Sequence, residues 1–230
     1  MKKYARELVE SSCRALTESR KTFKDIFGIM FSRPSEIMAE WLDEDNNRCV
    51  MTFEEGEKRI RNAAYAIYEN AGARGRFLAL DMENSPDWII AFWAILMSGN
   101  KPYLVNRRHP VRLTRGIIQT LGISFSVAEG QTGYPCMYIS AEELHISGHE
   151  DFGKDEKTAS LFANEIALST SATTMNEVVC IYDGERVANQ ILNCKGILLE
   201  NKLMPKFYHG ALKQLAFLPF YHIFGLMAVY

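Results

Sequence analysis

Apolar segments typical of buried strands alternate with helical patterns between residues 76 and 129. The strand-like segments are "RFLALDME", "KPYLVN" and "ISFSVAE", and a helical pattern separates each from the next. Parallel neighbouring strands need a crossover connection of this kind, and the crossover is almost always right-handed. The alternation therefore predicts an α/β fold with a mostly parallel β-sheet and helices on its faces.

The first of these helices, in "NSPDWIIAFWAILMSGN", is apolar on almost every side. Ser85 is a suitable N-cap, Pro86 suits the first helical position, and Gly99 is a suitable residue to end the helix. The apolar run from Trp88 to Met97 is too short to cross a bilayer. We therefore expect a buried central helix and no insertion into a membrane.

Further elements are predicted within this unit and on both sides of it. Thr52 and Glu55 form a capping box, and Gly72 ends the helix that follows it. Pro110 opens a helix that closes before Gly122. The other predicted elements are helices over 1–20, from Phe23 to a stop at Pro34, and in "ERVANQILNCKGILLENK", and strands in "IMAEWLD", "RCVMTF", "CMYIS", "EIALSTS" and "VVCIYDG".

The pattern divides the chain into four parts. A helical lead-in (1–21) precedes a first α/β subdomain (22–150), and a charged, glycine-containing linker (151–164) leads to the start of a second α/β subdomain (165–230). The last residues, "IFGLMAVY", are apolar and carry no capping signal. We expect the natural chain to continue past Tyr230.

Composition excludes several classes of function. A net charge of -2 gives no bulk attraction to nucleic acid or to anionic membranes. We interpret the basic run Arg107–His109 as a solvated surface.

Five scattered cysteines without a CxxC pair favour reduced thiols and a cytoplasmic protein. His145 and His149 have a spacing that zinc tolerates, but no nearby Cys, Glu or His completes a plausible ligand set, so a loop is favoured.

A hydroxyl-rich turn lies between the predicted strands "EIALSTS" and "VVCIYDG". Ser or Thr occupies five of the six positions in 169–174. A phosphate site needs hydroxyls and backbone N–H groups that converge on anionic oxygens, and such a turn can supply both. Composition alone also fits an ordinary polar turn, and both interpretations stay open at this point.

Four stretches, in this order, resemble the N-terminal half of the adenylate-forming superfamily, which includes acyl-CoA synthetases and peptide-synthetase adenylation domains. The early region from "MTFEEGEKRI" to "KPYLVN" is similar to the family's first part. "LSTSATT" resembles its signature loop T-S-G-T-T-G-x-P-K-G, and "GERVANQILN" resembles the helix after that loop. "LAFLPFYHIFGL" resembles its P-x-x-H-x-x-G motif.

The resemblance implies the N-terminal part of the adenylate-forming ligase fold and a reaction. An enzyme of this family uses ATP and Mg²⁺ to convert a carboxylic acid into an acyl-adenylate and passes the acyl group to a thiol such as CoA. By position, Thr170, Ser171, Thr173 and Thr174 would contact ATP phosphates, and His222 would lie near the acid. Without the resemblance, His222 fits a core histidine at a bend.

The loop departs from the family pattern. Ala172 and Met175 replace glycines, and Glu177 and Val178 stand where proline and lysine belong. The missing lysine removes a charge-assisted contact of about 1.5–3 kcal/mol, and Glu177 adds like charge near a triphosphate. The family's later nucleotide and metal residues have no counterpart here, so we expect residues 1–230 alone to be inactive. The alternative is a non-catalytic pseudo-ligase domain that serves as a binding module.

Overall fold

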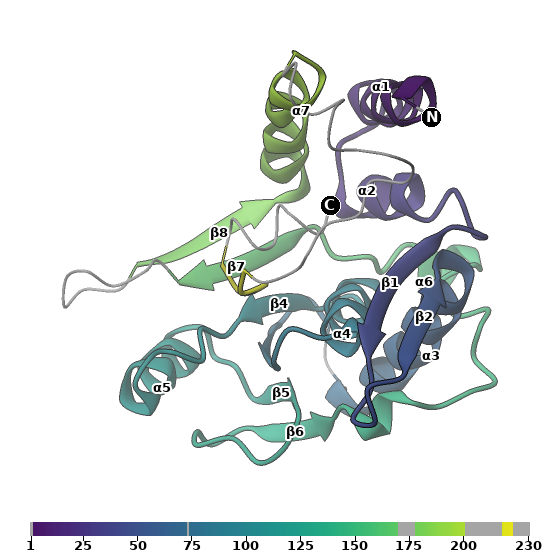
Figure 1. Cartoon of the computed structure of the whole chain (residues 1–230). Helices are drawn as coiled ribbons and strands as arrows, with labels where there is room; N and C mark the ends of the chain where they lie inside the picture. The colour runs from purple at the N-terminus through teal and green to yellow at the C-terminus, as the bar shows by residue number, and fades with distance from the viewer. Residues whose placement is uncertain (1, 73, 170–177, 201–217, 223–230) are drawn as a thin grey trace.

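The computed structural model describes residues 2–72, 74–169, 178–200 and 218–222, with side chains placed from residue 7 onward and up to residue 194 in the last helix. The predicted elements occur in the predicted order (Figure 1). The elements are α1 (Lys2–Glu18), α2 (Phe23–Met30), β1 (Ile37–Leu42), β2 (Arg48–Thr52), α3 (Phe53–Ala71), β3 (Phe77–Asp81), α4 (Pro86–Met97), β4 (Lys101–Leu104), α5 (Val111–Thr120), β5 (Phe125–Ala128), β6 (Met137–Ser140), the short 3-10 helix η1 (Glu142–Leu144), α6 (Glu156–Ala159), β7 (Glu165–Ser169), β8 (Val179–Asp183) and α7 (Gly184–Glu200). Two short helices that the sequence did not predict, η1 and α6, occur between β6 and β7.

Six strands form one mixed sheet in the order β6-β5-β3-β4-β7-β8. Every neighbouring pair is parallel except β7 and β8, which are antiparallel. Strands β1 and β2 form a separate antiparallel pair around the turn at Asp43–Asn47. The predicted α/β class with a mostly parallel sheet is therefore confirmed.

Helices cover the two faces of this sheet unequally (Figure 1). The larger core lies on the face of α2, α3 and α4, where Leu80, Leu104 and Ile166 of the strands are buried in one cluster with Trp93 and Ile67. The smaller core lies on the face of α5 and combines side chains of β3, β4 and β7 with that helix. Its buried members are Ala79, Tyr103, Val105, Ile117, Ile118, Ile123, Tyr134 and Ala167.

Helix α4 is the centre of the larger core, as its sequence predicts. Nine of its residues, from Trp88 and from Ile90 through Met97, are buried. The Ser85 side chain accepts from the backbone N–H of Trp88, and Pro86 is the first helical residue. Gly99 follows the helix at φ 88, a backbone conformation that L side chains rarely adopt. No helix in the described ranges is long and apolar enough to cross a membrane.

Two apolar residues of the predicted linker (151–164) are buried against the first part of the chain. Phe152 and Ala163 are buried, and the N–H of Ala163 donates to the carbonyl of Leu96. These apolar side chains can be buried although charged residues surround them in the sequence, because each charged group can still reach solvent. Beyond this segment β7 pairs with β4, so the sheet itself continues across the predicted subdomain boundary.

Candidate functional site

The carboxyl ends of five parallel strands meet at one edge of the sheet. The register pairs Leu80 with Leu104 and Leu104 with Leu168, which places the ends of β3, β4 and β7 side by side. Strands β5 and β6 end in register with them at Ala128 and Ser140. In open α/β sheets, ligands bind outside this edge, where the connecting loops gather. We call it the carboxyl edge.

A cavity of about 380 Å³ opens at the carboxyl edge on the α5 side. Its walls are the end of β3, the loops that follow β4 and β5, and the first turns of α5. The lining residues include Asp81, Asn106, Arg107, His109, Thr114, Glu129, Thr132 and Tyr134. The cavity is therefore polar, and its charged groups decide what it can accept.

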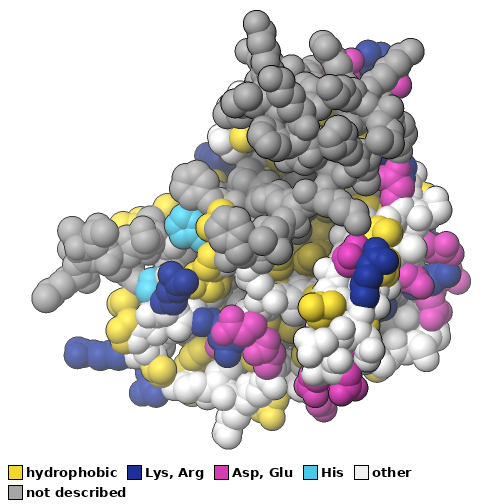
Figure 2. Space-filling view, in the orientation of Figure 1, with side chains coloured by type: hydrophobic (Ala, Val, Ile, Leu, Met, Phe, Trp, Pro, Cys, Tyr) yellow, Lys and Arg dark blue, Asp and Glu magenta, His cyan; other side chains and the backbone are white. Residues whose placement is uncertain are grey.

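Arg107 lies among three carboxylates in this cavity wall. Its guanidinium is 3.3 Å from Asp81, 3.1 Å from Glu83 and 2.9 Å from Glu129. Burial opposes the charge on Arg107, but the hydrogen bond and charge of Glu129, followed by Glu83 and Asp81, outweigh it and raise its pKa. Figure 2 shows Asp and Glu side chains next to Lys and Arg side chains on the surface. Since its charge is balanced in this way, Arg107 serves as a brace between loops.

Tyr134 closes the floor of the cavity. Its hydroxyl donates to the Asp81 carboxylate over 2.6 Å. Burial raises the pKa of Tyr134 and the neighbouring Asp81 raises it further, so the phenol stays protonated. Asp81 thus holds two loops at once, through Tyr134 and through Arg107.

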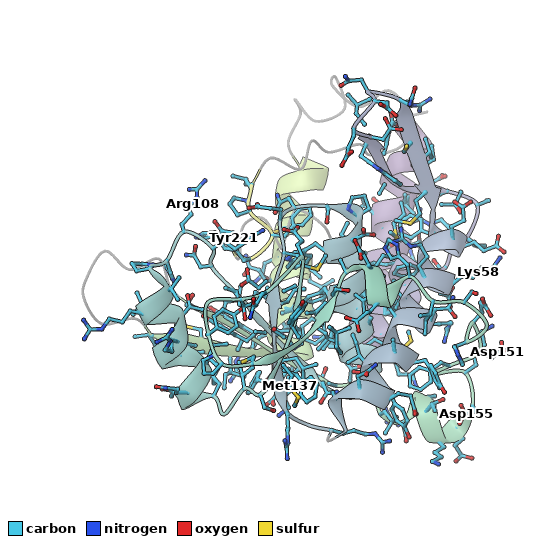
Figure 3. All side chains as sticks on the ribbon, turned by 90° about the horizontal axis from the view of Figure 1, so that it is seen from below. Lys58, Arg108, Met137, Asp151, Asp155 and Tyr221 are labelled. Carbon is cyan, nitrogen blue, oxygen red and sulfur yellow. The ribbon has the colours of Figure 1, made fainter. Side chains whose placement is uncertain are left out.

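The turn that carries His222 docks on the same edge of the sheet. The side-chain amide of Asn84, three residues after β3, donates to the carbonyl of Leu218 over 2.7 Å and accepts from the N–H of Phe220 over 2.9 Å. The Phe220 ring is buried, 5.2 Å from the ring of Trp88. Figure 3 places Tyr221 on the same side of the molecule as the outward-pointing Arg108. Two stretches that resemble the ligase family, "NSPDW" and "LPFYH", are therefore in direct contact.

The structure places only part of the predicted site. Ser169 ends β7 and Val179 begins β8, so the hydroxyl-rich turn leaves from the carboxyl edge. Thr170, Ser171, Thr173 and Thr174 lie outside the described residues, and their roles stay predictions. His222 is half-buried, and its N–H closes a turn onto the carbonyl of Pro219 over 3.0 Å.

The two loop histidines have separate partners. His145 Nε2 is 2.8 Å from the Arg59 guanidinium and 3.4 Å from Asp87. The His149 ring stacks on Tyr65 with ring centres 3.6 Å apart. No group of three or more His, Cys, Asp or Glu side chains within the described ranges is arranged to hold a metal ion. Both histidines instead fasten the loop after β6 to α3 and α4.

Sequence reasoning missed Asn84, Arg107 and Tyr134 as members of this edge. Asn84 directly precedes the N-cap Ser85, which is the signal that placed it in a loop next to a helix start. Arg107 was interpreted as a solvated charge, because nothing local shows that Asp81 and Glu129 leave neighbouring strands beside it. Only the strand order β5-β3-β4 brings Arg107, Asp81 and Glu129 together.

No protein-family model and no curated protein match this sequence. Solved structures do match. O-succinylbenzoate Coenzyme A synthetase (MenE) from Bacillus subtilis, in complex with AMP, matches with a TM-score of 0.64 and 17% identity over 88% of this chain and 51% of its own. The N-terminal subdomain of Klebsiella oxytoca NpsA, in complex with 3-hydroxybenzoyl-AMSN, matches with a TM-score of 0.58 and 18% identity. The match covers 73% of this chain and 42% of the NpsA chain.

A nonribosomal peptide synthetase, FmoA3, in its alpha-methyl-L-serine-AMP bound form, matches with a TM-score of 0.54 and 14% identity, over 74% of this chain and 19% of its own. This chain therefore spans about half or less of the length of the structures it matches. The three structures are adenylate-forming enzymes, and the chain has the fold of their N-terminal subdomains. The fold that the resemblance implies is confirmed.

Proposed function

We propose that this chain is the N-terminal part of an AMP-dependent synthetase/ligase that activates a carboxylic acid with ATP. A carboxylate oxygen attacks the α-phosphorus of ATP, the acyl-adenylate forms, and pyrophosphate leaves. A thiol such as CoA then attacks the acyl carbon, and AMP leaves. The matched structures with AMP or adenylate analogues bound support this class of reaction.

One observation carries the proposal. The start of the hydroxyl-rich turn, after Ser169, and the turn that carries His222 leave from the same carboxyl edge. The two motifs are about fifty residues apart in the sequence, and the α/β topology brings both to the edge where such sheets bind ligands. An acid and the phosphates of ATP must meet at one place, and this edge offers it.

The proposed residue roles are the ones that the resemblance implies. Thr170, Ser171, Thr173 and Thr174 would donate hydroxyl and backbone hydrogen bonds to ATP phosphates, and His222 would donate to the acid carboxylate. The described residues show no three-ligand metal cluster, so they do not fit an all-protein Mg²⁺ site. Mg²⁺ usually keeps several waters and binds through substrate phosphates. The proposal therefore assigns the ion no ligand from this part of the chain.

The proposal also covers the cellular location of the protein, the division of the chain into subdomains and the thiol acceptor. All five cysteines are free thiols, which suits a cytoplasmic enzyme. The division into 1–21, 22–150, 151–164 and 165–230 is retained as a proposal, with the sheet shared across its last boundary. A thiol acceptor such as CoA would approach the acyl-adenylate from the open side of the carboxyl edge.

Calorimetric titration of the 230-residue chain with ATP and Mg²⁺ tests the phosphate role. Ser171→Ala combined with Thr174→Val removes two hydroxyls, and we expect ATP affinity to fall roughly tenfold or more. Ser11→Ala is the matched control, because the Ser11 hydroxyl donates only to Leu8 within α1. Equal ATP affinity in all three proteins would contradict the assignment of the turn.

A second function, a non-catalytic binding module, is favoured by the altered loop. Ala172, Met175 and Val178 replace the glycines and the lysine that the resemblance implies. The triple change Ala172→Gly, Met175→Gly and Val178→Lys separates the two functions. A large gain in ATP affinity supports a weakened enzyme, whereas no ATP binding before or after the change supports the binding module.

A further inference from the structure

The turn Leu218–His222 is attached to the rest of the molecule in two different ways. The Phe220 ring packs into the larger core against Trp88. The Asn84 side chain forms hydrogen bonds to the backbone on both sides of Pro219. Apolar burial holds a segment down without fixing its direction, because the hydrophobic effect is non-directional. The two hydrogen bonds are directional and fix the register of the turn.

Asn84 is suited to this task by its chemistry. A primary amide offers a donor and an acceptor in one plane, so it can pair with backbone as a peptide group does. Pro219 has no N–H, which leaves the Leu218 carbonyl and the Phe220 N–H as the polar backbone groups on either side of it. Asn84 uses both. A carboxylate in its place would face the Leu218 carbonyl without a donor.

The bond to Leu218 adds little stability. Asn84 and Leu218 are exposed, so this hydrogen bond replaces one to water, whereas the Phe220 N–H belongs to a buried residue and needs its partner. The segment on the other side of the contact carries His222, whose N–H closes a turn onto the carbonyl of Pro219. The backbone of His222, from which the imidazole extends, therefore follows the position of Pro219, which Asn84 holds from both sides.

We infer that Asn84 is a positioning residue that fixes the His222 turn at the carboxyl edge and so sets where the carboxyl group of a bound acid meets the imidazole. This inference rests on the proposed function for its ligand. The contact itself, between Asn84 and residues 218–220, does not depend on that function.

Nuclear magnetic resonance of the ligand-free chain tests the contact. We compare wild type with Asn84→Ala and with Asn70→Ala, a control in which a side-chain amide donates to a carbonyl of its own helix. In Asn84→Ala we expect roughly tenfold faster hydrogen exchange at the Phe220 amide. We also expect shifted ring resonances for His222 and unchanged ones for His109, His145 and His149. Unchanged Phe220 exchange and His222 resonances would overturn the inference.

Asn84→Asp adds a pH readout that a purely structural role would not give. Only the protonated Asp side chain can donate to the Leu218 carbonyl, so the ligand-free His222 and Phe220 signals should approach the wild-type values at low pH. They should move to the Asn84→Ala values as pH rises past the titration of the new carboxyl group, whose reference pKa is about 3.9. A pH-independent Asn84→Asp spectrum at these residues contradicts the clamp.

A ligand experiment links the clamp to the acid. Benzoyl-sulfamoyladenosine, a stable acyl-adenylate mimic, is titrated into wild type, Asn84→Ala, His222→Ala and the double variant. We expect each single variant to weaken binding by a similar factor and the double variant to be no worse than His222→Ala. Additive losses would overturn the link. Absence of binding to wild type would refute the proposed function, while the ligand-free spectra would still decide the clamp.

Discussion

At the residue scale, the hydrogen bond from Tyr134 to Asp81 ties the loop after β5 to the end of β3. This bond requires the phenol to keep its proton. Because the pKa of Tyr134 is raised by burial and by Asp81, the folded protein holds a proton that the unfolded chain loses near pH 10. The unfolded state then binds fewer protons than the native state, so the free energy of unfolding falls as pH rises above about 10. Below that pH the contribution is fully present.

Urea unfolding at pH 8 and pH 10.5 measures this effect. Wild type should lose stability between the two values, and Tyr134→Phe should lose less, because its ring carries no proton to release. Tyr138→Phe is the control, since Tyr138 is 44% exposed. An identical pH response of Tyr134→Phe and wild type would show that the phenol is not held as described.

Gly99 and Gly116 form a matched pair of glycines with opposite expected responses. Gly99 has φ 88, and an added Cβ would lie 3.1 Å from the Leu161 carbonyl oxygen. Gly116 lies inside α5 and has nothing within 4 Å of that position. Gly99→Ala should destabilise by more than about 1 kcal/mol, whereas Gly116→Ala should stabilise by roughly 0.5–1 kcal/mol. Urea denaturation compares them, and equal effects would contradict this assignment of strain.

At the scale of whole elements, hydrogen bonds attach the loop after β6 to α3. Asn62 of α3 is buried; its side chain accepts from the N–H of His149 and donates to Glu150. The Arg61 guanidinium donates to the carbonyl of Phe152 over 2.7 Å. These contacts convert a segment rich in charge and glycine into part of the folded surface.

Asn62→Ala should release this loop without unfolding α3. The His149 N–H loses its acceptor, which costs about 1–3 kcal/mol if the group stays buried. Hydrogen exchange followed by mass spectrometry should show faster exchange in peptides covering 146–153 and little change in α4. Asn70→Ala, which alters only a bond inside α3, controls for helix fraying. Unchanged exchange in 146–153 would contradict the anchoring role.

Local sequence signals predicted the elements well because their physical causes are local. The capping box of Thr52 and Glu55 and the cap at Ser85 appear in the structure as predicted. The contact of Asn84 with Leu218 spans 134 positions, and no periodicity or cap signal reaches that far. The burial of Phe152 was missed for a related reason: one aromatic side chain among many charges leaves no pattern.

At the scale of the whole molecule, loops gather at the carboxyl edge of a mostly parallel sheet, and the resemblance predicted this fold correctly. Thr170 to Thr174 lie outside the described residues, so that part of the predicted site is still a prediction. The contact of Leu218 and Phe220 with "NSPDW" was not predictable, because the resemblance gave the order of the motifs and not their contacts. Spatial neighbours follow from strand order, which crossover rules restrict without fixing.

Residues 1–230 should show no ATP–pyrophosphate exchange with any acid. The resemblance places the adenine-binding segment, the acidic Mg²⁺ ligand and the catalytic lysine after the matched stretches. Exchange with acetate, octanoate, benzoate and amino acids is measured against heat-treated protein. Acid-dependent exchange above that background would contradict the expected inactivity, although it would support the family.

The location of ATP binding is the property to measure first. Titration of the ¹⁵N-labelled chain with ATP and Mg²⁺ reports on every backbone amide at once. We predict that the shifts concentrate at the carboxyl edge, in residues 169–178, in Asn106–His109 and around His222. Shifts confined to α1, α7 or the β1–β2 pair, or no shifts at millimolar ATP, would contradict a nucleotide site at this edge.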